Sequence, residues 1–373
     1  MSTFRTVQDV AHRHQANSYL STRSQPPMPE QAGFDLSTDQ PGFALDYAMV
    51  ESARMALESG QTHYVDVPGI AALREALATY LAEFDVVGYP ASALLVSAGI
   101  QESRFLTVQM IGASAEGIVI PEVVHPGVLK AIGVRPLAVQ RMPVNRERGY
   151  LPTPGAIRVA LQEGAKLIYL ESPARLTGAI FTPEEVQQIA QIVREHDGWV
   201  IWDQGLAPWV TSGQYVSLGA VPEMAGRVAL IGEAWPGTGL DSLMVGYVAA
   251  GEEWLEAIRS QKQIMAICTS TPSQYAALKA PVAYKVFHHN QHELLWAIRE
   301  RAIEHAQQVG SQTLAGATST ILALAPADCA TAIRRLHAAG FTVGDGADYG
   351  APETMRLAIT LDNGVAKALC YLG

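Results

Sequence analysis

The stretch Trp199-Val-Ile-Trp-Asp203 is apolar along its length and ends in a carboxylate. Consecutive side chains of a strand point to opposite faces, so a strand of this composition is covered on both faces. Five further short runs share this apolar character: 94–96, 117–120, 137–139, 167–170 and 228–231. Segments of helical character lie between them, at 102–110, 127–132, 154–162 and 183–196. This alternation predicts an α/β fold with a mostly parallel large-domain sheet between helices.

The helix predicted at 183–196 has a marked start, because Thr182 can cap it and Pro183 suits its first position. After Tyr247 the pattern changes to two helices, predicted at 252–265 and 291–308. Short strands at 320–324, 341–343 and 356–360 then surround a helix at 328–338, which predicts a small α+β lobe. The predicted domains are an N-terminal arm with a small-lobe segment (1–45), a large domain (46–275) and a small C-terminal domain (276–373).

Composition limits the classes of partner. The chain is 49% hydrophobic and 17% charged, which is typical of a folded protein with a sizeable core. A net charge of −10 argues against nucleic acid or an anionic membrane as a partner. The 3 cysteines are widely spaced and suggest no disulfide framework. Residues 1–31 lack the apolar run that a signal peptide needs, and we expect a flexible or partner-crossing arm there rather than a transit peptide; no segment has the length and composition of a membrane span. We therefore expect a cytoplasmic protein.

The segment Ser97-Ala-Gly-Ile-Gln101 lies between a predicted strand and a predicted helix. Backbone N–H groups at a helix start can bind a phosphate, helped by the positive end of the helix dipole. Gly99, Ile100 and Gln101 are therefore candidate phosphate-binding residues. A glycine at such a turn also has a purely conformational explanation.

Two longer stretches carry a resemblance to a known family: Glu171-Ser-Pro-Ala-Arg-Leu-Thr-Gly178 and Ile231-Gly-Glu-Ala-Trp-Pro-Gly-Thr-Gly-Leu-Asp-Ser-Leu-Met-Val-Gly-Tyr247. With the strand ending at Asp203 between them, their order and spacing resemble the class I/II aminotransferases, the fold-type-I pyridoxal-phosphate enzymes. The resemblance covers residues 30–362. It implies an aminotransferase-like fold, amino-acid metabolism and a homodimer with shared active sites.

The resemblance also implies roles for single residues. Tyr64 would reach the cofactor phosphate of the neighbouring subunit, His125 would stack on the pyridine ring, and Asp203 would pair with the ring nitrogen. Arg356 would clamp the carboxylate of the substrate with its planar guanidinium. Structural roles remain open for each of them: a tyrosine in a surface turn, a histidine before a proline, a carboxylate that caps a turn, and an arginine starting an edge strand.

Several positions depart from the family pattern. Aligning the second stretch on Tyr247 puts Pro236 where the family has the lysine that holds the cofactor as a Schiff base. Four more cofactor contacts change as well: asparagine to Arg175, tyrosine to Leu206, serine to Glu233 and arginine to Met244. Proline cannot form an imine, and a glutamate beside a phosphate dianion is unfavourable. The sequence therefore predicts an altered cofactor site.

Three hypotheses follow. The first is an enzyme of specialised biosynthesis that binds an amino acid with non-covalent pyridoxal phosphate, or their adduct, and is not an ordinary transaminase. The second is a cofactor-independent enzyme in which Asp203, His125, Glu233 and Arg175 carry out acid/base chemistry, while Arg356 and Arg175 bind a carboxylate substrate. The third is a catalytically inactive partner subunit. No metal site is predicted, because no carboxylate or cysteine accompanies the histidines at 288–292.

Overall fold

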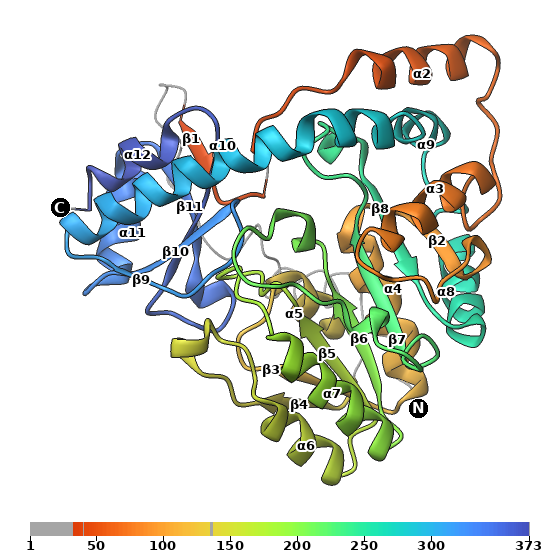
Figure 1. The fold of residues 1–373 in the computed structure, drawn as a ribbon, viewed down its shortest axis with the longest axis horizontal. Coiled ribbons are helices and arrows are strands. Elements are labelled where there is room, and N and C mark those ends of the chain that lie inside the picture. The colour runs from red at the N-terminus through yellow and green to blue at the C-terminus, as the bar shows by residue number, and fades with distance from the viewer. Residues whose placement is uncertain (1–32, 40, 135–136, 373) are drawn as a thin grey trace, which may run out of the picture.

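Two β-sheets form the framework of the computed structural model, which describes residues 33–39, 41–134 and 137–372 (Figure 1). The larger sheet has seven strands in the order β2-β8-β7-β6-β5-β3-β4. Neighbours from β7 to β4 are parallel, whereas β8 is antiparallel to both β7 and β2. The strands are β2 (Leu94–Ala98), β3 (Ile118–Pro121), β4 (Val139–Met142), β5 (Leu167–Glu171), β6 (Trp199–Asp203), β7 (Val228–Glu233) and β8 (Val245–Ala249). The predicted α/β fold with a mostly parallel sheet is confirmed.

Helices cover both faces of this sheet because its strands are apolar on both sides. In β5, Tyr169 packs into one core, whereas Ile168 and Leu170 pack into another. Helices α4 (Gly99–Ser114), α5 (Pro126–Gly133) and α8 (Glu252–Met265) contribute to the first core. Helices α3 (Ala71–Ala82), α6 (Pro154–Gln162), α7 (Pro183–Glu195) and α9 (Thr271–Ala277) contribute to the second, and α2 (Tyr47–Glu58) packs on α9.

Local signals set some helix ends better than others. The prediction that Thr182 caps α7 is confirmed, because its side chain accepts the N–H of Glu185 and Glu185 accepts the N–H of Thr182. The predicted start of the long helix at 291 is wrong, because α10 runs from Ala280 to Gln308. Its first turns carry Val282 and Val286 on the exposed side, which obscures the amphipathic pattern there.

The smaller sheet combines both ends of the chain. Its order is β1-β11-β12-β10-β9, and β1 (Phe34–Leu36) pairs in parallel with β11 (Phe341–Asp345). The other strands are β9 (Gln312–Thr313), β10 (Ile321–Ala325) and β12 (Met355–Ala358), and helices α10, α11 (Cys329–Ala338) and α12 (Gly364–Leu369) contribute to the core of this sheet. Figure 1 shows α10 running from α9 to this sheet.

The predicted domain boundaries stay a prediction. Within the described ranges, no helix combines the length and the apolar composition of a membrane span.

Because the central strand β6 is buried, truncation of one of its side chains should lower the stability of the protein. Ile201 is fully buried, so Ile201→Ala should lower the free energy of unfolding by about 2–5 kcal/mol, through lost burial and the cavity that remains. Val159→Ala removes a side chain that is 51% exposed and should change it by less than about 0.5 kcal/mol. Urea denaturation of both variants measures the difference, and equal effects would contradict the assignment of β6 to the core.

Candidate active site

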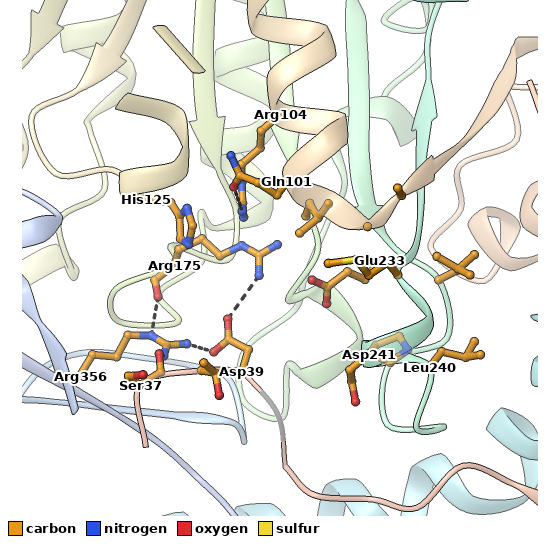
Figure 2. Close-up of a pocket in the computed structure, with 18 of the residues that line it drawn as sticks. Ser37, Asp39, Gln101, Arg104, His125, Arg175, Glu233, Leu240, Asp241 and Arg356 are labelled. Carbon is orange, nitrogen blue, oxygen red and sulfur yellow. Dashed lines mark hydrogen bonds and ion pairs between the residues drawn. The ribbon is translucent and has the colours of Figure 1, made fainter. Parts of the chain in front are cut away.

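A cavity of about 270 Å³ lies where α4, the loop after β7 and the smaller sheet meet (Figure 2). The structure brings most of the predicted site residues to its wall: Gly99, Ile100, Gln101, His125, Arg175, Glu233 and Arg356. Asp203 lies behind two arginines and does not line the cavity. Tyr64 also lies outside the lining, with a side chain that is 77% exposed.

The carboxylate of Asp203 is the most densely bonded group of the site. Arg104 donates to Oδ2 from Nε at 3.0 Å and from Nη2 at 2.8 Å, and the Tyr169 hydroxyl donates to the same oxygen at 2.9 Å. Arg175 donates to Oδ1 at 2.9 Å, and the N–H of Gly205 does so at 3.1 Å. Both oxygens are therefore engaged by protein groups.

Burial alone would raise the pKa of Asp203, but the charges of Arg175 and Arg104 outweigh it and hold that pKa below its usual value. Asp203 is fully buried, and the two arginines are only 2% exposed. A buried charge needs a partner, because transfer from water without compensation is costly. The aspartate and its two arginines therefore form one interdependent group.

Helix α4 starts directly after β2 and points its N-terminus at the cavity. Gly99 has a φ of +73°, a conformation that glycine adopts readily. Glu102 caps the turn by accepting the N–H of Ala98 at 2.6 Å, and it pairs with Lys262 at 2.6 Å. Lys262 is fully buried and is held in this pair. Gly99, Ile100 and Gln101 remain on the cavity wall, where phosphate binding stays a prediction.

His125 caps α5, and its Nδ1 accepts the N–H of Gly127 at 3.0 Å. Burial and the guanidiniums of Arg104 and Arg175 lower the pKa of His125 well below its usual value. The ring is therefore neutral at pH 7, with its proton on Nε2. It meets the ring of Tyr349 edge to face, with centroids 5.8 Å apart.

Glu171, at the end of β5, is buried between two backbone donors. It accepts the N–H of His125 at 2.8 Å and the N–H of Arg175 at 3.0 Å. Burial and the nearby charge of Asp203 raise the pKa of Glu171 to about 7. Glu171 therefore holds the loop of His125 and the loop of Arg175 in place at the cavity wall.

Arg356 on β12 reaches the cavity from the smaller sheet. Its Nε donates to the carbonyl of Arg175 at 2.9 Å, and its Nη1 donates to the carbonyl of Ser37 at 3.3 Å. Its Nη2 pairs with Oδ1 of Asp39, and the other oxygen of Asp39 lies 3.5 Å from Arg175 Nη1. Figure 2 shows Asp39 between these two guanidiniums.

Two acidic residues line the opposite side of the cavity. Burial raises the pKa of Glu233, and the positive charge of Arg175 opposes this only in part. Burial also raises the pKa of Asp241. A carboxyl group with a raised pKa can hold or exchange a proton, so the proposed catalytic role of Glu233 stays a prediction.

Arg104 and Asp39 are site residues that the sequence analysis missed. Arg104 lies one turn after the candidate phosphate-binding residues, in a helix with few other charged residues. Its charge in an otherwise mostly uncharged helix could have indicated a role at the site. Asp39 follows a short strand and had no comparable signal. Its position depends on the pairing of β1 with β11, which lie about 300 residues apart in the chain.

A buried aspartate at a strand end, a helix N-terminus and buried arginines around one cavity are features of α/β proteins that bind small anionic molecules at the end of a sheet. The particular family follows from comparison. The chain belongs to the aminotransferase class I and II family, which matches residues 33–370.

Individual named aminotransferases are similar to this chain in sequence and in structure. The aspartate/prephenate aminotransferase of Thermus thermophilus is 27% identical over 346 residues, 90% of this chain and 88% of that protein. The putative aminotransferase YugH of Bacillus subtilis is 26% identical over 248 residues, 65% of this chain and 64% of its own length. The structure of a Thermus thermophilus aspartate aminotransferase with maleate superimposes with a TM-score of 0.83, at 24% identity and 91% coverage of both chains.

These comparisons contradict the hypothesis that the chain is not an ordinary transaminase, together with its two alternatives. The finding that overturns it is the match over 90% of the chain to a protein named aspartate/prephenate aminotransferase. The residues read as departures, such as Pro236, did not place the chain outside the family, because the family match extends over residues 33–370.

The family uses pyridoxal phosphate, in agreement with the cofactor predicted from the sequence. The described side chains do not fit this cofactor in the predicted pose. Asp203 has both oxygens engaged by protein groups, so a ring nitrogen could reach it only if an arginine moved. Among the described residues of the cavity wall there is no lysine, and Pro236 is one of the lining residues.

The interdependence of Asp203 and its arginines is testable. Arg104→Met leaves a buried carboxylate with one guanidinium and should lower the free energy of unfolding by about 3–5 kcal/mol. Arg158→Met is the control, because Arg158 and its partner Glu195 are each 40% exposed; it should cost at most about 1 kcal/mol. Chemical denaturation measures both. A loss at Arg104 no larger than at Arg158 would contradict the argument.

The raised pKa of Glu171 should make the stability of the protein depend on pH. The folded protein keeps its proton up to a pKa of about 7, whereas an unfolded chain releases it near 4.5. Between these pH values the folded state binds more protons, so this carboxyl group makes stability fall as pH rises. The Glu171→Gln variant lacks this titrating group. Its free energy of unfolding should therefore rise relative to that of the wild type as the pH increases from 4.5 to 7. A difference between the two that is constant across this range in urea titrations would contradict the raised pKa.

Proposed function

We propose that this chain transfers amino groups between an amino acid and a 2-oxo acid, and that Arg356 binds the carboxylate of its substrate. The reaction class comes from the family and from the names of the relatives. The observation that supports the role of Arg356 is its position: the residue is only 1% exposed and yet lies on the cavity wall. A buried arginine held in place by two backbone carbonyls presents its planar fork in a fixed direction.

Other residues have proposed roles at the same cavity. Gly99, Ile100 and Gln101 would bind a phosphate through the N-terminus of α4, since they lie on the wall. His125 would stack on a ligand or donate its Nε2 proton, which its bond to Gly127 supports. Glu233 would exchange a proton, and its raised pKa supports this.

We further propose that pyridoxal phosphate binds without a covalent link to the chain, because Pro236 stands at the position of the family's lysine. When bound, this cofactor supplies an electron sink for chemistry at the α-carbon. Pairing of Asp203 with the ring nitrogen would require Arg175 or Arg104 to release a hydrogen bond to this carboxylate. Arg175 would assist Arg356 at the substrate carboxylate through Nη1, the nitrogen that faces Asp39.

We also propose a homodimer with shared active sites. Tyr64 is 77% exposed although the resemblance gives it a role at a cofactor phosphate, and a second copy could use it. Exposed apolar side chains on the nearby helix α2 support an interface there: Tyr47, Val50, Met55 and Leu57. The cytoplasmic location and the specialised biosynthetic setting stay predictions.

The direct test combines the purified chain with pyridoxal phosphate, L-aspartate and 2-oxoglutarate, and then with a panel of other amino acids. Amino-group transfer should appear as glutamate formation, measured by chromatography. Borohydride treatment followed by mass spectrometry should show no cofactor attached to the chain. Absence of glutamate with every donor would refute the proposed reaction, and a chain-bound cofactor would refute the non-covalent mode.

The role of Arg356 has its own test. Arg356→Lys keeps the charge but loses the planar fork, and should lower kcat/KM by about 10-fold to 100-fold, as expected for one lost bidentate contact. Arg301→Lys alters an exposed arginine of α10 and should leave kcat/KM unchanged. Equal values for both variants would contradict carboxylate binding by Arg356.

A further inference from the structure

Asp39 holds its carboxylate in the part of the cavity that the proposed function assigns to a substrate. One oxygen pairs with Nη2 of Arg356, and the other lies 3.5 Å from Nη1 of Arg175. Arg356 and Arg175 are the two residues to which the sequence analysis gave a substrate-binding role. Figure 2 shows the side chain of Asp39 pointing at both guanidiniums from the segment that follows β1.

The geometry resembles that of a bound carboxylate. Each oxygen of Asp39 faces a different guanidinium, as the two oxygens of a ligand carboxylate would. Both arginines are almost completely buried, but the side chain of Asp39 is 25% exposed. The cations are thus part of the framework, and Asp39 is the member of the cluster that faces solvent.

The side chain of Asp39 can move without displacement of the strand that precedes it. Strand β1 ends at Leu36, so its pairing with β11 does not include Asp39. The main chain is linked to Arg356 by the carbonyl of Ser37, at a long 3.3 Å. Movement of the Asp39 side chain therefore leaves the described hydrogen bonds of the smaller sheet intact.

We propose that Asp39 is an internal competitor for the substrate-carboxylate site: its carboxylate occupies Arg356 and Arg175, and an acidic ligand binds by displacing it. This inference rests on the proposed function, because it takes Arg356 as the carboxylate-binding residue. Asp39 thereby sets the affinity for carboxylate ligands and favours those that contact both guanidiniums at once.

The charges of the cavity support a competition. The described lining contains three arginines, Arg104, Arg175 and Arg356, and three acidic residues, Asp39, Glu233 and Asp241. Arg104 and part of Arg175 are committed to Asp203 behind the wall. Asp39 is the lining acid that pairs with Arg356, so its substitution removes a negative charge from the place where a ligand carboxylate would bind.

The test measures binding, which does not depend on turnover. Maleate, a rigid dicarboxylate, is titrated by calorimetry into the full-length wild type and into Asp39→Asn and Asp39→Ala. Both variants should bind maleate about tenfold more tightly than the wild type or better, the size expected when one competing charged contact is removed. Thermal denaturation confirms that the variants are folded, and two substitutions guard against an effect specific to asparagine.

Two further variants separate competition from general charge effects. Asp241→Asn removes another carboxyl group of the cavity wall that no described arginine pairs with, and should change maleate affinity much less than Asp39→Asn. The double variant Arg356→Lys/Asp39→Asn should not show the tighter maleate binding expected of Asp39→Asn alone. Unchanged or weaker binding by both Asp39 variants overturns the proposal, and so does an equal gain in Asp241→Asn.

Failure of the proposed function gives a different pattern. Tighter maleate binding in the Asp39 variants without any glutamate formation would refute amino-group transfer and leave the competitor in place. Glutamate formation with maleate binding that does not respond to Asp39 would refute the competitor alone.

Discussion

The buried carboxylate of Asp203 is the group on which the arrangement of the site depends. It ends the central strand β6 at full burial, where an unpaired negative charge would be strongly unfavourable. Arg104 compensates it from α4, and Arg175 compensates it from the loop after β5. Because each arginine is also buried, removal of any of the three charges leaves buried charge that is less well compensated. This mutual requirement fixes where α4 and the loop lie relative to the sheet.

The same interaction extends to the second sheet. Arg175 bonds Asp203 with one nitrogen and lies near Asp39 with another, and its carbonyl accepts a hydrogen bond from Arg356. A chain of ion pairs and hydrogen bonds thus runs from β6 to β12, through the cavity wall. Guanidinium suits this position because it has several donors in a fixed plane, whereas an ammonium is a point charge that loses its proton more readily on burial. A ligand carboxylate at Arg356 would therefore influence both sheets at once.

The sequence predicted the strands well and the partners of charged groups poorly, for physical reasons. A strand buried on both faces must be apolar throughout, so runs such as 199–203 were visible without knowledge of their neighbours. A strand end also indicated Asp203 as a candidate site residue, whereas Glu233 was indicated by the resemblance to the family. The pairing of Arg104 with Asp203 joins residues 99 positions apart, and no periodic pattern records it. Asp39 was missed for the same reason, since its place depends on a strand pairing between the two ends of the chain.

In the proposed alignment, Pro236 takes the position of the family's lysine in a chain that keeps the family's fold. Strands β7 and β8 pair in register up to Glu233 and Gly246, which closes the loop at its base. Trp235 is 1% exposed, with its ring 5.5 Å from that of Tyr80, so the residue before the proline is fixed in the core. The packing of Trp235 therefore helps to hold Pro236 at the cavity wall. A proline side chain carries no proton donor or acceptor, so the proposed proton exchange at this cavity falls to other lining residues, such as Glu233.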